Sequence, residues 1–488
     1  MVATTFGKLF GTVTTSGRSF YGVPYAKPPT GKRRFTDPQP WDEQYPGGAR
    51  NAISPGSMCV SDAQKTGSED CLFANFFTPS NATAQSRLPV LLFIHGGSFV
   101  TGSGSEYDGR NLASMNNVIV VTINYRLGSF GFLQVNSTSA NFGFKDQREG
   151  IRFVKREVAA FGGDPNRLMV FGESAGGISV QLHVVAKKSD GLFSYALSES
   201  GFPTIKTARY SLNSSTTYIN AAGCKSGAGA TLLDCLQGKT VKELLDASAI
   251  TSPGNGNPFL VPGWGPSVDM TEFFEDPIVS LRNGDFNRNV TVIAGTNTDE
   301  GWLFAPQGYV NEREYREFVQ EVIYGHGRPL NKSEIDAVLE VYPAKTLGNN
   351  HEMASAVAGD VTFICGTRYM VRMVSTYSTR KPFLYHFDVP IEAGLVLHAS
   401  ELPYVFDMTK YLNNKQKQAV ADAMGHIWSS FPRDGVPSDD VWPAYDNVTD
   451  KNILFNVEMH DGKFQTESNR RKRYCDFWEA SLYSFPYN

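Results

Sequence analysis

Short apolar runs alternate with amphipathic stretches from about residue 88 to residue 200. Val90–Ile94 is one such run, and Val118–Asn124 is a second that is rich in β-branched residues. Both are typical of buried strands in a parallel sheet. Asp146–Phe161 instead spaces its apolar residues three and four positions apart, which predicts a helix with one apolar face. This alternation predicts a parallel sheet with crossover helices.

A third apolar run, Leu168–Phe171, leads into Gly172-Glu173-Ser174-Ala175-Gly176 and then into a helical pattern over Gly177–Ala186. Strand, sharp turn and helix therefore follow each other without an intervening loop. Further strands of the same sheet are expected at Tyr195–Leu197, Val290–Ala294 and Pro382–Phe387, with large insertions of less regular pattern at 202–285 and 301–380.

The composition is that of a globular protein with a large core. The chain has 488 residues, of which 41% are hydrophobic and 19% charged, and no repeat or linker divides it. We therefore expect residues 1–488 to form a single domain. The net charge of −4 argues against nucleic acid as a partner, because no basic field is present to hold phosphates. The apolar runs are too short to span a membrane, which takes about 20 residues.

The chain carries features of a secreted protein. Met1–Phe10 has no basic region followed by an apolar core, so we expect that no signal peptide remains. The set of Asn-X-Ser/Thr sequons is dense and favours secretion and glycosylation. The candidate sites are Asn81, Asn136, Asn213, Asn289, Asn331 and Asn447.

The 6 cysteines lie outside any metal-binding pattern, so disulfides are the expected state. Six cysteines permit about 15 pairings. Free thiols in a cytosolic enzyme are the alternative. Near neighbours in sequence would pair first, which leaves two cysteines to close a long loop. This pairing is Cys59 with Cys71, Cys224 with Cys235, and Cys365 with Cys475.

Ser174 is the candidate nucleophile. A Gly-X-Ser-X-Gly pentapeptide alone is a weak signal, but its place between a buried strand and a helix is the one that the chemistry needs. The turn holds the serine in strained geometry, and Gly172 and Gly176 relieve the crowding around it. The alternative is a serine in an ordinary glycine turn.

A nucleophilic serine also needs a base and N–H donors for the oxygen anion that forms on the substrate. The backbone N–H of Ala175 is one expected donor. His95-Gly96-Gly97-Ser98-Phe99 follows an upstream strand and forms a loop whose backbone can approach the substrate. The alternative for this loop is a tight turn without a catalytic role, and His95 itself is expected to be structural.

An ordered series of motifs runs along nearly the whole chain. It comprises Phe20-Tyr21-Gly22-Val23-Pro24-Tyr25-Ala26, Ser68-Glu69-Asp70-Cys71-Leu72, Asn124-Tyr125-Arg126-Leu127-Gly128, Asp146-Gln147-Arg148, Phe161-Gly162-Gly163-Asp164-Pro165 and Phe171-Gly172-Glu173-Ser174-Ala175-Gly176-Gly177. With this series the chain resembles the type B carboxylesterases, the family of cholinesterases, esterases and fungal lipases. The resemblance implies an α/β-hydrolase fold, with a mostly parallel twisted sheet, flanking helices and insertions that cap an active-site gorge.

The resemblance also implies the other members of a catalytic triad. The acid of this family lies in an Asp-Glu-Gly loop, which places it at Glu300, although the residues alone leave Asp299 an equal rival. The base precedes a Glu-Leu-Pro-Tyr-Val-Phe stretch, which identifies His398 rather than His183 or His386. The order Ser174, Glu300, His398 is the one that this fold uses.

The same resemblance places two further oxyanion donors at the backbone of Gly97 and Ser98. It supports the disulfide pairing given above and implies that no metal or organic cofactor is required. It also implies two buried ion pairs, Arg34 with Glu69 and Arg126 with Asp146.

The loop Val60–Asp70 limits the range of expected substrates. Lipases of this family carry a much longer loop there as an amphipathic lid, and cholinesterases carry a choline-binding tryptophan that this loop lacks. We therefore expect a serine carboxylesterase acting on short- to medium-chain or small soluble esters. The alternatives are a lipase or sterol esterase, and a non-catalytic binding protein of the same fold. Aromatic residues that could line its pockets are Phe73, Phe99, Trp264, Trp302 and Phe304.

Overall fold

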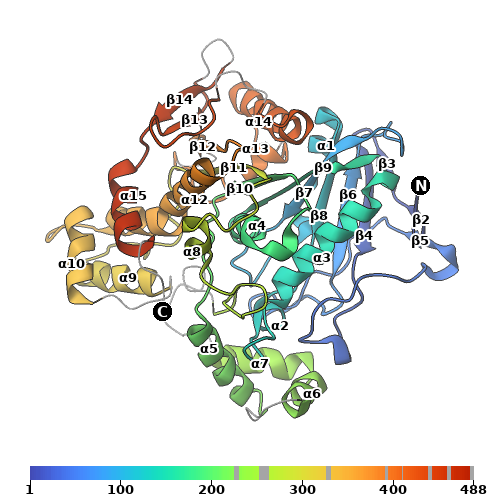
Figure 1. Cartoon of the computed structure of the whole chain (residues 1–488), viewed down its shortest axis with the longest axis horizontal. Helices are drawn as coiled ribbons and strands as arrows, with labels where there is room; N and C mark the ends of the chain where they lie inside the picture. The colour runs from blue at the N-terminus through green and yellow to red at the C-terminus, as the bar shows by residue number, and fades with distance from the viewer. Residues whose placement is uncertain are drawn as a thin grey trace.

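A mixed sheet of 11 strands forms the centre of the molecule, in the order β14-β13-β12-β11-β10-β9-β7-β8-β6-β4-β3 (Figure 1). The computed structural model describes residues 1–224, 230–251, 263–325, 331–390, 394–408, 410–437, 442–458 and 463–483. The strands of the sheet are β3 (Thr12–Thr14), β4 (Gly17–Pro24), β6 (Phe73–Thr78), β7 (Leu88–Ile94), β8 (Ile119–Ile123), β9 (Gly163–Glu173), β10 (Tyr195–Glu199), β11 (Thr291–Asn297), β12 (Phe383–Phe387), β13 (Lys451–Phe455) and β14 (Gln465–Ser468).

The centre of this sheet is parallel, as the sequence predicts. β13, β12, β11, β10, β9, β7 and β8 pair in parallel, and the six strands expected from apolar runs all lie among them. The antiparallel edges were not predicted: β3, β4 and β6 on one side and β14 on the other. A small second sheet is formed by β1 (Val2–Thr4), β2 (Gly7–Phe10) and β5 (Ala49–Asn51).

Helices cover both faces of the sheet. One face packs on α1, α13 and α14, and the other on α3, α4, α8 and α12, so that two separate apolar clusters lie on the two sides (Figure 1). The helices are α1 (Arg110–Asn116), α2 (Gly128–Phe132), α3 (Phe142–Glu157), α4 (Ala175–Val185), α8 (Pro277–Arg282), α12 (Cys365–Tyr377), α13 (Leu402–Val405), α14 (Lys415–Asp434) and α15 (Lys472–Trp478).

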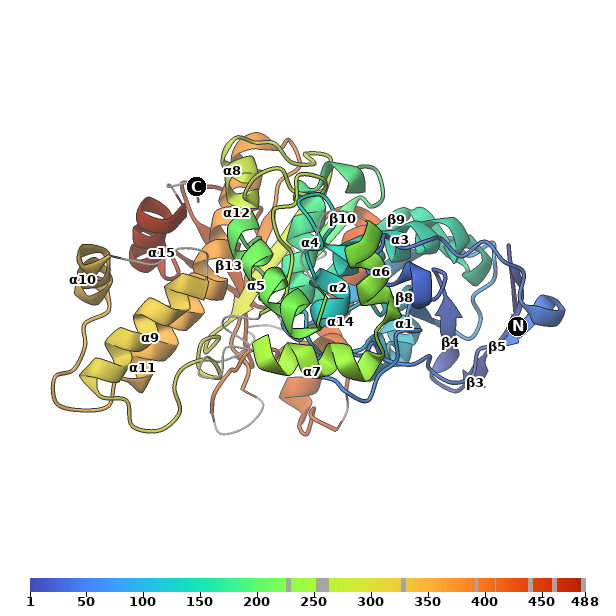
Figure 2. The same cartoon turned by 90° about the horizontal axis from the view of Figure 1, so that it is seen from below.

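The two large insertions form helical groups on separate sides of the molecule (Figure 2). The first contains α5 (Ala208–Ala221), α6 (Ala230–Gly238) and α7 (Val241–Thr251), and its segments 225–229 and 252–262 lie outside the described residues. The second contains α9 (Glu312–Gly325), α10 (Lys332–Val341) and α11 (His351–Gly359), and 326–330 lies outside the described residues. In the described part of the chain, no helix has both the length and the apolar character that a membrane span requires.

Both expected buried ion pairs are confirmed. Arg126 Nε lies 2.7 Å from Asp146 Oδ2, and the two side chains are 4% and 0% exposed. Arg34 binds both carboxylate oxygens of Glu69 at 2.6 and 2.7 Å. Arg34 also donates to the carbonyl of Leu236, so this pair ties the N-terminal region to α6 of the first insertion.

Three disulfides are present, and they have the pairing that the sequence analysis proposed. They join Cys59 to Cys71, Cys224 to Cys235, and Cys365 to Cys475. The last one joins residues 110 positions apart and attaches α15 to α12. In the chain-entropy model such a long loop stabilises the fold by roughly 5 kcal/mol, and each short loop by about 3 kcal/mol.

The Arg126–Asp146 pair provides a test of the packing. In Asp146→Asn, the buried guanidinium loses its counter-charge, so we expect the free energy of unfolding to fall by about 3–5 kcal/mol. Chemical denaturation followed by fluorescence would measure the change. The matched control is Asp108→Asn, which removes an exposed partner of Arg110 and should cost less than about 1 kcal/mol. Equal losses in the two variants would contradict the expectation.

Candidate active site

Ser174 lies at the sharp turn between β9 and α4. Its backbone has φ 56° and ψ −121°, a strained conformation for a residue with a side chain. The turn packs against the end of β7, because a Cβ at Gly172 or Gly176 would lie 2.5 or 1.9 Å from the carbonyl oxygen of Ile94. Only glycine fits at these two positions. Ser174 is partly accessible, whereas the residues on either side of it are buried.

The predicted oxyanion loop follows β7 directly. Gly97, Ser98 and Phe99 have φ values of 103°, 54° and 63°, so three successive residues adopt left-handed backbone geometry. Gly97 and Ser98 are partly accessible, and within the described residues their N–H groups have no recorded hydrogen-bond acceptor. Ala175 is the first residue of α4, so its N–H has no acceptor within that helix. All three predicted donors are therefore available to an anion.

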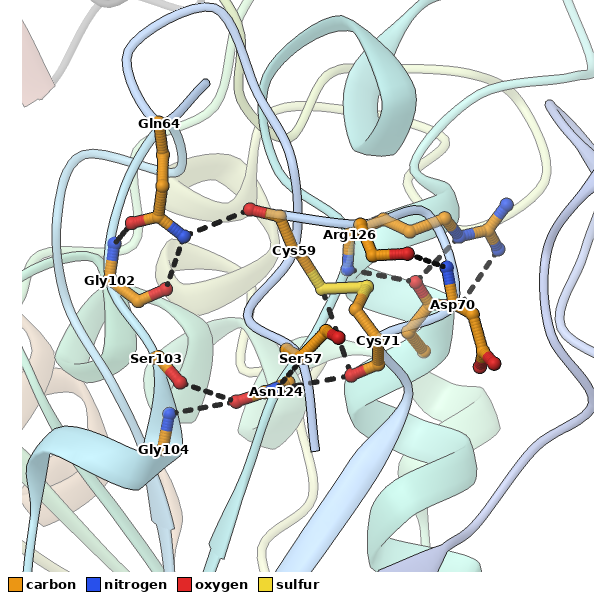
Figure 3. The surroundings of a disulfide bond; sticks show 12 residues. Ser57, Cys59, Gln64, Asp70, Cys71, Gly102, Ser103, Gly104, Asn124 and Arg126 are labelled. Carbon is orange, nitrogen blue, oxygen red and sulfur yellow. Dashed lines mark hydrogen bonds and ion pairs between the residues drawn. A yellow bond between two sulfur atoms is a disulfide. The ribbon is translucent and has the colours of Figure 1, made fainter. Parts of the chain in front are cut away.

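The short disulfide loop holds the segment that follows the oxyanion loop. Gln64 accepts hydrogen bonds from Thr101 Oγ1 and Gly102 N, both at 3.0 Å. Ser61 Oγ donates to the carbonyl of Val100. Figure 3 shows Gln64 beside Gly102, with the Cys59–Cys71 disulfide next to them. Residues 60–70, which the sequence marks only by the lack of a long lid and of a choline-binding tryptophan, thus also hold the segment next to the left-handed backbone in place.

His398 contacts Glu300 and not Asp299. Its Nδ1 lies 2.6 Å from Glu300 Oε2. Ser200 Oγ and Asn297 N donate to the other oxygen of Glu300, at 2.5 and 2.7 Å. Both oxygens of this buried carboxylate therefore have hydrogen-bond partners. Asp299 instead accepts from the backbone N–H of Val396 at 2.9 Å, so its carboxylate holds the loop that leads to His398.

The other ring nitrogen of His398 faces Glu173. Nε2 lies 3.1 Å from Glu173 Oε1. Burial lowers the pKa of His398, but Glu173 and Glu300 raise it by more, to about 9. Burial raises the pKa of Glu173 to about 7, against the opposing effect of His398. The two carboxyls therefore stabilise the protonated imidazole, which is the form that His398 takes once it has accepted a proton.

Two aromatic rings enclose the imidazole. The ring centroids of Phe304 and Phe363 lie 5.2 and 4.5 Å from that of His398. Phe363 belongs to a π-helical turn, Asp360–Ile364, that connects α11 and α12. Such turns are rare and occur often at functional sites. The sequence singled out Phe304 but missed Phe363, because a π-turn inside a helical pattern has no periodic signature.

A second pair of glutamates lies behind the triad candidates. Glu199 and Glu401 are both fully buried. Glu199 Oε1 accepts from Trp428 Nε1 at 2.8 Å, and Glu401 Oε2 accepts from Asn297 Nδ2 at 2.5 Å. Burial and the charge of Glu401 raise the pKa of Glu199 well above its usual range. Burial, Glu173 and Glu300 raise the pKa of Glu401 to about 8. Both carboxyls are therefore held in the protonated form.

The remaining predicted residues lie elsewhere. His95 stacks on Tyr125 at 4.5 Å, and burial lowers its pKa to about 4, so it is a packed, neutral residue. His183 is buried in α4, and His386 lies in β12. Trp302 packs on His351, Trp264 on Tyr218 and Phe99 on Phe132. Among the described residues, no cluster of His, Cys, Asp and Glu has the form of a metal site.

Glu173, Glu199 and Glu401 were not predicted as site residues. Glu173 and Glu401 stand inside motifs quoted for the family resemblance, and that was the available signal. Glu199 ends β10 at the same edge of the sheet as Glu173 ends β9, with which it pairs in register. Parallel neighbours end at one edge, so their last side chains converge there.

Comparisons with known proteins cover most of the chain. A family model described as "Carboxylesterase family" matches residues 1–478. The para-nitrobenzyl esterase of Bacillus subtilis (strain 168) is 32% identical over 94% of this chain and 95% of its own length. The cocaine esterase of Homo sapiens is 30% identical over 95% and 87%. The solved structure of a PNB esterase has a TM-score of 0.83 at 30% identity and covers 97% of this chain and 99% of that one.

The protonated state of Glu401 predicts a pH-dependent stability. The folded protein keeps this proton up to pH about 8, whereas the unfolded chain releases it above about 4.3. Stability from this group is therefore present at low pH and is lost as the pH rises towards 8. Glu401→Gln has no proton to lose and keeps an oxygen for Asn297, so it should gain stability over the wild type, by an amount that grows as the pH rises.

Thermal unfolding at pH values between 5 and 8 would measure this difference. The control is Glu352→Gln, because Glu352 is exposed and its replacement should shift the curve little at any pH. Parallel curves for wild type and Glu401→Gln would contradict the protonated state.

Proposed function

The chain belongs to the carboxylesterase family and is a carboxylesterase, and we propose that it cleaves esters through a triad of Ser174, His398 and Glu300. The observation that carries the proposal is the 2.6 Å contact between His398 Nδ1 and Glu300 Oε2. The strained turn at Ser174 supports it, because this conformation is costly and recurs where a nucleophile must stand clear of the sheet.

In the proposed mechanism His398 takes the proton of Ser174 Oγ, and Oγ attacks the carbonyl carbon of the ester. The N–H groups of Gly97, Ser98 and Ala175 stabilise the oxygen anion of the tetrahedral intermediate. His398 then gives the proton to the leaving alcohol, which leaves an acyl-enzyme. Water, activated by the same imidazole, releases the acid and restores Ser174.

Glu300 holds the imidazole in one tautomer and stabilises its positive charge during these steps. The hydrogen bonds from Ser200 and Asn297 hold the Glu300 carboxyl in position. Phe304 and Phe363 limit rotation of the ring and keep water from it. We assign Glu173 a supporting role, because its carboxylate raises the basicity of His398 from the side of Ser174.

The proposed substrates are short- to medium-chain or small soluble esters. The loop Val60–Asp70 supports this substrate class. It is closed by the Cys59–Cys71 disulfide and is hydrogen-bonded to the segment that follows the oxyanion loop. A loop held in this way has no freedom to act as a long lid that opens on a lipid surface.

We further propose that residues 1–488 form a single α/β-hydrolase domain and that the protein is a secreted glycoprotein. One sheet takes its edge strands from both the N-terminal and the C-terminal regions, which supports the single domain. Three disulfides and exposed asparagines at all of the sequons support secretion. These asparagines are Asn81, Asn136, Asn213, Asn289, Asn331 and Asn447.

Hydrolysis of p-nitrophenyl esters from two to sixteen carbons tests the nucleophile and the substrate class. The wild type should turn over the short chains fastest, and Ser174→Ala should lose activity by about 10⁶-fold. A preference for long chains, or a large rise in rate above the solubility limit of a triglyceride, would favour a lipase. No hydrolysis of any ester by a folded wild type would favour the binding protein.

A pair of neighbouring variants tests the triad acid. Glu300→Gln should lower kcat by about 10⁴-fold, because the amide no longer stabilises the imidazolium. Asp299→Asn is the matched control: it keeps an oxygen for the N–H of Val396, and its kcat should stay within about tenfold of the wild type. The reverse order of effects would make Asp299 the acid.

A further inference from the structure

Lys206 lies on the segment that leaves Ser200, the residue that donates to Glu300. Its backbone is fixed on both sides: the N–H donates to the carbonyl of Pro266 at 2.8 Å, and the carbonyl accepts from Val268 at 3.0 Å. This short bridge, Lys206 with Ser267, fixes the origin of the lysine side chain.

The ammonium group of Lys206 has no counter-charge in the part of the chain that the structure describes. No carboxylate of those residues lies within ion-pair distance of Nζ, and Nζ makes no hydrogen bond with them. The one recorded contact is with the ring of Tyr210, whose centroid is 4.5 Å away. Burial lowers the pKa of Lys206 to about 8. A partly buried cation with only a ring as its partner is costly unless a ligand supplies the negative charge.

Lys206 also lies close to the oxyanion loop. A Cβ at Gly265 would be 3.4 Å from Cδ2 of Phe99 and 3.8 Å from Cε of Lys206. Gly265 has no side chain, so the end of Lys206 and the ring of Phe99 can both lie close to this position. Phe99 directly follows Gly97 and Ser98, the two N–H donors of the proposed hole. Lys206 thus approaches Phe99, the residue that adjoins the two N–H donors of the proposed hole.

We propose that Lys206 is a specificity residue that binds a carboxylate, or an equivalent anionic group, on the ester substrate. The inference rests on the proposed function and adds the charge of the preferred substrate. An ammonium with three donors and one aromatic neighbour is suited to a carboxylate oxygen, because the ring stabilises the cation and leaves its donors free. Lys206 takes no part in proton transfer, so neutral esters should react without it.

Matched ester pairs test the proposal. Monomethyl adipate and methyl hexanoate differ by a charge on the acyl side, and para-acetoxybenzoate and phenyl acetate differ by a charge on the leaving side. Release of acid or phenol, followed by chromatography, gives kcat/KM for each. The variants are Lys206→Met, which keeps the length and loses the charge, and Lys206→Arg, which keeps the charge. Lys242→Met, at an exposed lysine of the same insertion, controls for net charge.

In at least one pair, Lys206→Met should lower kcat/KM for the anionic ester by about tenfold to a hundredfold and leave the neutral ester within about twofold. Lys206→Arg should retain most of the anionic activity, and Lys242→Met should change neither. The pair that responds tells whether the charge belongs to the acyl or the leaving side.

The proposal is overturned if the wild type cleaves the neutral esters but the anionic and neutral members of both pairs respond equally to Lys206→Met. That result leaves the triad intact. Failure of the proposed function has a different signature, because hydrolysis would then be absent in the wild type or would persist in Ser174→Ala.

Discussion

The balance of charge around one imidazole governs the site. Four glutamates, Glu173, Glu199, Glu300 and Glu401, are buried within a small region, and His398 contacts two of them. Four ionised carboxylates in an apolar interior would repel each other strongly, so most of them must hold protons or find donors. Glu300 has three hydrogen-bond partners, whereas Glu199 and Glu401 have one each. The pKa values of Glu199 and Glu401 are raised, so these two carboxyls stay protonated. Glu300 is thus the carboxylate of this group that is held most firmly against the imidazole.

Residues with strained backbone lie at the same edge of the sheet, and neighbouring strands and a disulfide loop hold them in place. Ser174 and the run Gly97–Phe99 all have positive φ values. β7 and β9 pair in parallel up to Ile94 and Gly172, so the turn at Ser174 and the oxyanion loop start from neighbouring, fixed points. Ser61 and Gln64 of the disulfide loop bind Val100 and Gly102, in the segment that follows the oxyanion loop. Rigid support on both sides allows N–H donors to be in place before a substrate arrives, which is the condition for electrostatic stabilisation of an anion.

The residues proposed to select the substrate come from other parts of the chain than the catalytic groups. The triad candidates come from strand ends and adjacent loops, which are common to the fold. Lys206 and Gly265 come from the first insertion, and Phe363 comes from the end of the second. Insertions of this kind can change without disturbing the sheet, so the proposed role of Lys206 does not depend on the elements that hold the triad candidates.

Local pattern was enough to predict the parallel strands, the turn at Ser174 and the glycine loop, because each depends on contiguous residues: an apolar run, a strand-to-helix junction, a stretch without side chains. The antiparallel edges were missed for two reasons. β3 and β14 are short and partly exposed, and in β4 and β6 polar residues or glycine interrupt the apolar ones. Sequence left Glu300 and Asp299 equal without the family resemblance. Only the tertiary structure distinguishes them. Glu300 contacts the imidazole of His398, whereas Asp299 contacts the backbone of Val396, and both contacts join residues about a hundred positions apart. Glu199, Glu401 and Lys206 also became recognisable only after folding, because burial and the absence of a partner are properties of the packed chain and not of any local sequence.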